Sequence, residues 1–297
     1  MLVDLVHVRT SDGVRLDGAL RMPEKSATES KSNPPIDAVV CVHGTGANFY
    51  SRGVWDPLAE RLLARGIPVL TVNTRGHDGI STAYSIDGAR RVGAAYEIID
   101  DARYDLPAWC GYLQERGHRR VALLGHSLGA LKSIYALTHV DALKVTCVVA
   151  ISAPHLSYER FIASRSAETF LRAFGQAEAL IEAGAPDRLI EIEFPIPYAI
   201  SARGFIDKYG PQARYDVLAL LPKVRCPLLM MYGAAELSGN VPFEGLPDRL
   251  EALREEHALS LSVEVVAGAD HFYSGCQPEL AVRVERWLRG RLPAGRE

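Results

Sequence analysis

The chain alternates short apolar runs with longer amphipathic segments. Six runs rich in valine, isoleucine and leucine predict β-strands at residues 38–42, 68–72, 121–124, 145–151, 227–232 and 261–266. Continuous apolar runs of this length are typical of strands buried on both faces, as in parallel sheets. Two further runs, 2–9 and 14–21, flank Ser-Asp-Gly and predict an antiparallel hairpin at the sheet edge.

Helical periodicity fills most of the intervals between these runs. It predicts helices at residues 54–65, 101–116, 128–137, 246–256 and 279–289. Alternating strands and helices indicate βαβ units. The expected fold class is therefore α/β, with a mostly parallel central sheet and helices on both faces.

Two segments interrupt this alternation. Residues 24–35, EKSATESKSNPP, are polar and predict a mobile surface loop. Residues 155–217 contain no convincing buried strand, although aromatic residues recur in them at irregular spacing. Because a structureless loop of that length is uncommon in a compact domain, this segment predicts a helical insertion that covers something. We expect a core formed by residues 1–154 and 218–297, with residues 155–217 as a helical cap.

The composition excludes several classes of protein. With 297 residues, 48% of them hydrophobic, the chain can bury a large core, and a net charge of −3 offers no basic footprint for nucleic acid. Its five cysteines are scattered and form no Cys-x-x-Cys pair, as in reduced cytosolic proteins. The N-terminus does not resemble a signal peptide, and no uncharged apolar stretch reaches the roughly 18 residues of a membrane span. We therefore expect a cytoplasmic protein.

The strongest chemical signal is Gly125-His126-Ser127-Leu128-Gly129, directly after one predicted strand and directly before a predicted helix. This is the G-x-S-x-G pattern in the strand-to-helix context that it requires. The sharp turn exposes Ser127 above the end of the sheet, and the flanking glycines leave room where a side chain would clash. The candidate nucleophile is therefore Ser127, against the alternative of a chance pentapeptide or a simple tight turn.

A nucleophilic serine needs a base, and the base needs an acid that orients it. In this architecture the acid and then the histidine follow the serine along the chain. Glu236 lies just beyond the strand at 227–232, and His271 lies just beyond the strand at 261–266. Open α/β sheets bind their ligands at these carboxyl ends of strands. The order and position predict Glu236 as the acid and His271 as the base.

Three aspartates compete with Glu236 for the role of acid. Asp270 adjoins His271, but neighbouring side chains diverge, and we expect it to be structural. Asp207 and Asp216 fall in the predicted cap, which is too mobile a location for an orienting acid.

Neither a metal nor a cofactor is expected. His43, His77 and His126 have a spacing that matches no zinc pattern. Gly44 and Gly46 belong neither to a complete dinucleotide fingerprint nor to a P-loop.

Together these motifs resemble those of the α/β-hydrolases. The likeness covers residues 36–152 and 223–290, and it includes the motifs at 43–46, 125–129, 233–236 and 268–271. The sequence is similar to the branch of monoglyceride-lipase-like and serine-aminopeptidase-like esterases, in which a helical cap is inserted between strands 6 and 7. The resemblance implies an oxyanion hole formed by the NH groups of Thr45 and Leu128. It also implies that the loop containing His77 supports the oxyanion loop. Glu236 departs from the commoner aspartate at the acid position.

These features predict a serine hydrolase that cleaves a small or medium carboxylic ester through Ser127, His271 and Glu236 by way of an acyl-enzyme. Amidases, thioesterases, lactonases and C–C bond hydrolases use the same triad, and fold and triad do not choose among them. A non-catalytic, hydrolase-like protein that binds a small ligand is the alternative from a different class.

The expected partner is a small ester-like molecule. The cap aromatics are candidates for an acyl pocket, and equally for packing the cap on the core. Arg165 and Arg203 are candidates for pairing with an anionic substrate. A homo-oligomer is compatible with the sequence.

Overall fold

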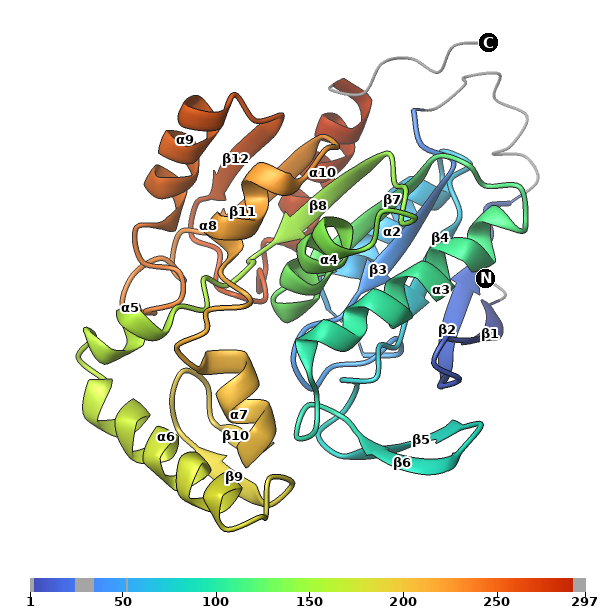
Figure 1. Ribbon diagram of the computed structural model, residues 1–297. Helices are drawn as coiled ribbons and strands as arrows, with labels where there is room; N and C mark the ends of the chain where they lie inside the picture. Colours follow the sequence, from blue (N-terminus) through green and yellow to red (C-terminus); the bar gives the residue numbers. More distant parts are fainter. Residues whose placement is uncertain (1–2, 25–34, 52, 291–297) are drawn as a thin grey trace.

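The computed structural model describes residues 3–24, 35–51 and 53–290. Its centre is an eight-stranded sheet in the order β1-β2-β4-β3-β7-β8-β11-β12 (Figure 1). The strands are β1 (Val3–Arg9), β2 (Arg15–Arg21), β3 (Ala38–Val42), β4 (Val69–Val72), β7 (Val121–His126), β8 (Cys147–Ile151), β11 (Leu228–Gly233) and β12 (Leu261–Val266). The β1–β2 and β2–β4 pairs are antiparallel and the other pairs are parallel. The predicted α/β fold and its edge hairpin are thus confirmed.

Helices cover both faces of this sheet. One face packs against α3 (Ala102–Gln114), α4 (Leu128–His139) and α9 (Leu246–His257). The other packs against α2 (Trp55–Leu63) and α10 (Gln277–Gly290), which also contact each other. Successive strand residues point to opposite faces, so in β8 Val148 and Ala150 join the first layer while Val149 and Ile151 join the second. This double burial explains the continuous apolar runs in the sequence.

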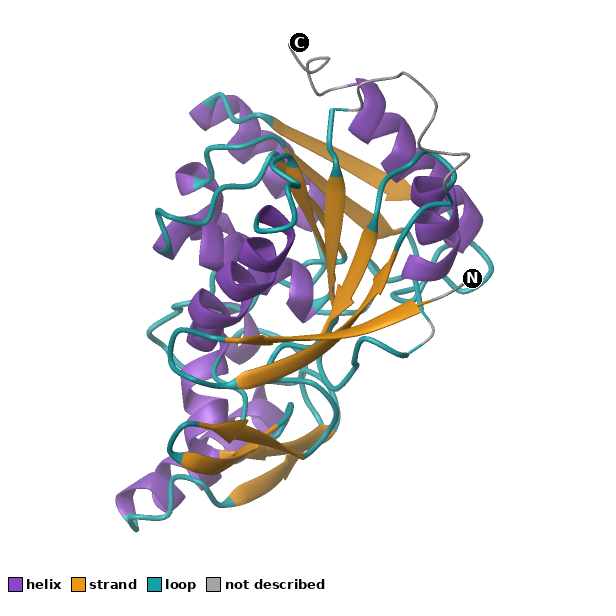
Figure 2. Ribbon diagram, turned by 90° about the vertical axis from the view of Figure 1, so that its right-hand side faces the viewer, coloured by secondary structure: helices purple, strands orange, loops and turns teal. Residues whose placement is uncertain are grey.

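The segment between β8 and α8 (Val217–Leu220) contains α5 (Tyr158–Ile162), α6 (Ala167–Glu182), β9 (Leu189–Ile192), β10 (Tyr198–Ser201) and α7 (Ala202–Tyr209). We call residues 155–217 the insertion. Figures 1 and 2 show its helices and its β9–β10 hairpin beyond the strand ends of the central sheet, beside the hairpin of β5 (Ser81–Ser85) and β6 (Gly88–Val92). Helices make up most of the regular secondary structure of the insertion, and an antiparallel pair of strands, which the sequence did not indicate, makes up the rest.

Predicted and observed elements agree in type and differ by a few residues at their ends. The hairpins β5–β6 and β9–β10 and the short 3-10 helices η1 (Ile99–Asp101) and η2 (Leu221–Lys223) were not expected. The polar loop predicted at 24–35 lies almost entirely outside the described residues. Within the described part of the chain, no helix combines the length and apolar character that a membrane crossing needs.

Trp109 of α3 fills the space between that helix and β2. Its side chain is fully buried, its Nε1 donates to the Asn73 carbonyl at 2.8 Å, and a Cβ on Gly18 would lie 2.9 Å from its ring. Trp109→Ala should lower the free energy of unfolding by about 3–5 kcal/mol, because it leaves a cavity and an unpaired carbonyl. Tyr84→Ala, at an exposed site, should change it by less than about 0.5 kcal/mol. Urea unfolding measures both, and equal losses would contradict this account.

Candidate active site

Ser127 occupies the single residue between β7 and α4. Its backbone has φ 55° and ψ −125°, a conformation that side chains rarely adopt. Its NH donates to the carbonyl of Ile151 in β8 at 2.8 Å, which ties the turn to the neighbouring strand. The strained turn therefore holds the Ser127 side chain at the carboxyl end of the sheet.

The two glycines of the motif are required by close backbone contacts. A Cβ on Gly125 would lie 2.4 Å from Ala130 Cα, and a Cβ on Gly129 would lie 2.3 Å from the carbonyl oxygen of Val42. Both distances are far below van der Waals contact. The pattern G-x-S-x-G is thus the condition under which β7, α4 and β3 can approach one another.

The structure brings Ser127, His271 and Glu236 into one hydrogen-bonded chain. His271 Nε2 lies 3.0 Å from Ser127 Oγ, and His271 Nδ1 lies 2.7 Å from Glu236 Oε2. A carboxylate only accepts hydrogen bonds, so Nδ1 carries the imidazole proton and Nε2 is free to accept one from the serine hydroxyl. This geometry allows a proton to move from Ser127 to His271.

Glu236 is almost completely buried and its carboxylate is fully hydrogen-bonded. Besides His271, the carboxylate accepts from the Gly233 NH at 2.7 Å and from Ser152 Oγ at 2.6 Å, both through Oε1. Ser152 directly follows β8 and has a positive φ of 53°. Three donors stabilise the buried negative charge, and they also prevent the carboxylate from rotating away from the imidazole.

The loop after β3 lies against the serine. A Cβ on Gly44 would lie 2.9 Å from Ser127 Cβ, and Gly44, Thr45 and Leu128 line the same cavity as Ser127. Among the described residues, the backbone NH groups of Thr45 and Leu128 donate to no backbone carbonyl. Both NH groups are therefore unpaired donors at residues that line the cavity with Ser127.

A buried histidine supports this loop. His43 Nδ1 donates to the Gly44 carbonyl at 2.8 Å, and His43 Nε2 accepts from the Thr74 NH at 3.1 Å. Burial, with help from the nearby Lys132 charge, lowers the pKa of His43 to about 3, so its imidazole is neutral. The support expected from the loop at 73–77 thus comes through Thr74, while His77 pairs with the adjacent Asp78.

His126 supports the loop of His271. Its Nε2 donates to the His271 carbonyl at 2.8 Å. Burial lowers the pKa of His126 to about 3, and the neighbouring His271 adds to this effect. A neutral His126 therefore acts as a structural hydrogen-bond donor beside Ser127.

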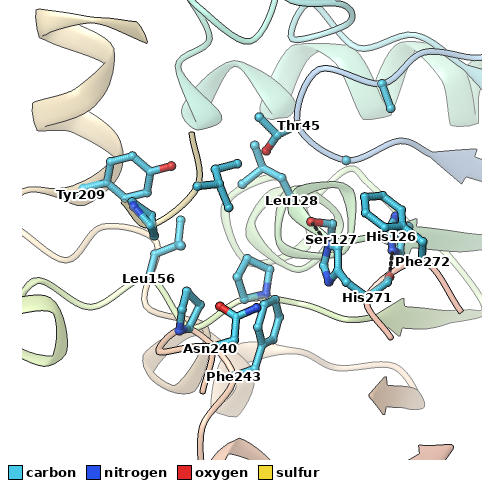
Figure 3. A pocket seen from close by; sticks show the side chains of 16 residues that line it. Thr45, His126, Ser127, Leu128, Leu156, Tyr209, Asn240, Phe243, His271 and Phe272 are labelled. Atoms are coloured by element: carbon cyan, nitrogen blue, oxygen red, sulfur yellow. Dashed lines mark hydrogen bonds between the residues drawn. The ribbon is translucent and has the colours of Figure 1, made fainter. Parts of the chain in front are cut away.

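The cavity above Ser127 has a volume of about 340 Å³, near the lower end of small-molecule sites. Most of its wall is apolar (Figure 3), and it is lined by Gly44, Thr45, Ala47, His126, Ser127, Leu128, Pro154, Leu156, Pro195, Ile196, Tyr209, Asn240, Pro242, Phe243, His271 and Phe272. The core and the insertion both contribute. Of the cap aromatics, Tyr209 lines the cavity, whereas Phe161, Phe170, Phe174 and Phe205 are buried in the apolar core.

The remaining candidate residues have structural partners. Asp270 Oδ1 accepts from the NH groups of Phe272 at 3.0 Å and Ser274 at 2.9 Å, which shapes the turn after His271. Asp207 accepts hydrogen bonds from Arg214 and Tyr215, and Asp216 caps the N-terminus of α8.

The two arginines that were candidates for an anionic substrate lie outside the cavity lining. Arg165 donates to the Gly239 carbonyl and Arg203 pairs with Asp187. In the described ranges, no three histidine, cysteine, aspartate or glutamate side chains gather as a metal site.

The comparisons with known proteins agree with this fold. The sequence matches the model of the Alpha/beta hydrolase family over residues 39–284. This match spans most of the chain, so the protein belongs to the alpha/beta hydrolase family, and the resemblance seen in its motifs is confirmed. A search of curated proteins finds no match.

Several solved structures are similar to this chain. Est1E from Butyrivibrio proteoclasticus, solved with bound ferulic acid, has a TM-score of 0.62 at 15% identity, covering 95% of this chain and 97% of that one. A monoacylglycerol lipase of Paleococcus ferrophilus has a TM-score of 0.61 at 19% identity, covering 93% and 99%. An esterase of Pyrococcus furiosus has a TM-score of 0.57 at 19% identity, covering 97% and 88%. At these identities the likeness shows the fold.

Sequence reasoning missed Ser152 and most of the cavity wall. Ser152 contacts Glu236 across 84 positions of the chain, and no local motif marks it. Its place immediately after a buried strand was the only available signal. Asn240 and Phe243 lie in a segment without periodicity, so nothing indicated their position beside Ser127.

The neutral state of His126 makes stability depend on pH. Since the pKa of His126 is about 3 in the folded protein and about 6.5 for an unfolded histidine, only the unfolded chain takes up this proton as pH falls below about 6.5. Proton uptake by His126 in the unfolded chain therefore lowers the free energy of unfolding by up to about 1.4 kcal/mol for each pH unit below that value. His126→Gln, which keeps an NH donor, should reduce the loss of unfolding free energy between about pH 7.5 and 5.5 by about 1.4 kcal/mol. Urea titrations of both proteins test this, and an unchanged loss would contradict it.

Proposed function

We propose that the protein hydrolyses small or medium carboxylic esters by acyl transfer from Ser127 to water. The observation that carries this proposal is the chain of hydrogen bonds from Ser127 Oγ through His271 to the buried Glu236. Such a chain activates a serine hydroxyl and has no evident use in a protein that only binds its ligand.

In the first half of the reaction, Ser127 Oγ attacks the ester carbonyl carbon while His271 Nε2 takes the hydroxyl proton. The negative charge that develops on the carbonyl oxygen is stabilised by the NH groups of Thr45 and Leu128. His271 then gives its proton to the departing alcohol, and an acyl-Ser127 ester remains. Glu236 holds the imidazole in position and stabilises its positive charge.

In the second half, water replaces the alcohol. His271 takes a proton from the water as its oxygen attacks the acyl-enzyme carbonyl. It then returns a proton to Ser127 Oγ, and the carboxylic acid leaves. The single catalytic cycle thus consumes one ester and one water.

We further propose that the insertion acts as the cap over this site. Leu156, Pro195, Ile196 and Tyr209 come from it and line the cavity. A cavity of about 340 Å³ with mainly apolar walls suits a short acyl chain, and it would exclude bulk water from the acyl-enzyme.

Ser127→Ala should reduce turnover of short p-nitrophenyl esters by at least about 10³-fold, because it removes the nucleophile. Ser133→Ala is the matched control, since Ser133 lies in the same helix and its hydroxyl donates to the Gly129 carbonyl. It should retain turnover. Spectrophotometric release of p-nitrophenol measures both variants.

A fluorophosphonate probe provides a second test of the same proposal. Mass spectrometry should find the adduct on Ser127 in the parent and no adduct in Ser127→Ala. Retained turnover in purified Ser127→Ala, or a parent that does not react with the probe, would refute the serine-hydrolase proposal.

Ser152→Ala should lower kcat by at least about tenfold and leave KM little changed. It removes one hydrogen bond to the Glu236 carboxylate, a loss of about 1.5–3 kcal/mol for a charged acceptor, whereas Ser152 does not line the cavity. Steady-state kinetics on p-nitrophenyl butyrate measure the two constants. A rise in KM at unchanged kcat would contradict this role for Ser152.

A further inference from the structure

One polar side chain stands in the part of the cavity wall that the insertion supplies. Tyr209 forms the last residue of α7, is buried, and lines the cavity among Leu156, Pro195 and Ile196. In Figure 3 its ring lies across the cavity from Phe272, with the hydroxyl turned toward the side of Ser127 and Leu128. The mechanism proposed above gives this hydroxyl no role.

A chain of hydrogen bonds leads from Lys208 through Tyr198 to Tyr209. Lys208 Nζ, which only donates, lies 3.4 Å from Tyr198 Oη, and Tyr198 Oη lies 3.2 Å from Tyr209 Oη. Two hydroxyls supply two protons, but only one proton fits between their oxygens. Either hydroxyl can donate in this pair. Because Tyr198 Oη already accepts from Lys208, which strengthens its own hydroxyl as a donor, we assign Tyr198 as the donor to Tyr209. The proton of Tyr209 then has no acceptor among the described residues and is available to a ligand.

Buried ion pairs fix the position of this group. The Lys208 side chain is 1% exposed and its Nζ lies 3.3 Å from Glu97 Oε2, while Lys132 Nζ lies 2.9 Å from Glu97 Oε1. Although burial alone would raise it, the two ammonium groups hold the pKa of Glu97 well below its usual range. Lys132 belongs to α4, the helix that begins after Ser127. Tyr209 is therefore held by the same framework as the reactive serine.

The charge of Lys208 strengthens the hydroxyl as a donor. An ammonium group that donates to Tyr198 polarises the Tyr198 and Tyr209 hydroxyls in sequence, and hydrogen bonds within such a chain reinforce one another. Such a donor forms its strongest hydrogen bonds with electron-rich oxygen atoms. A carboxylate oxygen should therefore bind more strongly than a neutral carbonyl oxygen. Because the neighbouring wall is apolar, the chain between this acceptor and the ester would be aliphatic.

We propose that Tyr209 determines specificity by donating a hydrogen bond to an oxygen acceptor at the end of the substrate remote from the ester. The substrate class is then an aliphatic ester whose acyl or alcohol chain carries a terminal carboxylate or carbonyl. This inference rests on the hydrolase function proposed above.

The acyl side is tested with three matched series of p-nitrophenyl esters: those of butanoic to octanoic acid, the half-esters of succinic to suberic acid, and the methyl esters of those half-esters. At the best chain length, kcat/KM for the half-ester should exceed that for the alkanoate by at least about tenfold, as expected for one hydrogen bond to a charged group. The neutral methyl ester should fall between them. Esters of butyric acid with alkanols and with ω-hydroxy acids, followed by pH-stat titration, test the alcohol side in the same way.

Two variants assign the preference to its source. Tyr209→Phe should bring the ratio of kcat/KM for the half-ester to kcat/KM for the alkanoate ester close to one, because it removes the hydrogen-bond donor and keeps the ring. Lys208→Met should lower the preference for the half-ester over the alkanoate ester more than it lowers the preference for the neutral methyl ester over the alkanoate ester. Tyr84→Phe, in the exposed strand β5, is the matched control and should keep the parent's ratio.

The outcomes separate this inference from the hydrolase proposal. Hydrolysis of plain alkyl esters with no preference for an acceptor on either side, or a preference that survives in Tyr209→Phe, would overturn the role of Tyr209 alone. Failure of every series, together with no fluorophosphonate adduct on Ser127, would overturn the hydrolase function and this inference with it.

Discussion

The turn at Ser127 is the constraint on which the site depends. β7 ends and α4 begins within one residue, and α4 then passes so close to β3 that a Cβ on Gly129 would lie 2.3 Å from the Val42 carbonyl. Such an approach excludes every side chain. In return, one short segment places Ser127 and Leu128 together in the lining of the cavity, beside the loop that contains Gly44. The strain stored at φ 55° is maintained by the strands and helices on either side.

Buried charge is stabilised in a similar way at both ends of the cavity. Near Ser127, Glu236 accepts from three donors, one of which is His271. On the insertion side, Glu97 lies between Lys132 and Lys208, and all three side chains are at most 2% exposed. A buried ion is costly unless several partners surround it, and losing one partner leaves an uncompensated charge. Both arrangements therefore favour one geometry of the charged side chains that they contain.

The fold, and the meeting of Ser127, His271 and Glu236 at one place, were predictable because local sequence encodes the strand ends that carry them. Strands buried on both faces give continuous apolar runs, and the turn at Ser127 demands a recognisable set of glycines. The β5–β6 hairpin was missed because its residues are largely exposed and follow no apolar pattern. Ser152 and Tyr209 were not assigned because their significance lies in contacts that span distant parts of the chain. Lys208, for example, meets Glu97 across 111 positions.

The core and the insertion contribute different parts of the cavity wall. The proposed reaction uses Ser127, His271, Glu236 and two backbone NH groups, all supplied by the core, whereas the opposite wall comes from the insertion. The Lys208–Glu97 ion pair joins these two parts, so the insertion can vary in its lining residues as long as a cation remains opposite Glu97. Members of a family with this architecture can therefore keep one fold and one reaction while their substrates diverge, as expected when a site is grafted onto a shared scaffold. If Tyr209 has the role proposed for it, the contacts behind Tyr209, more than the motif around Ser127, determine the substrate of this protein.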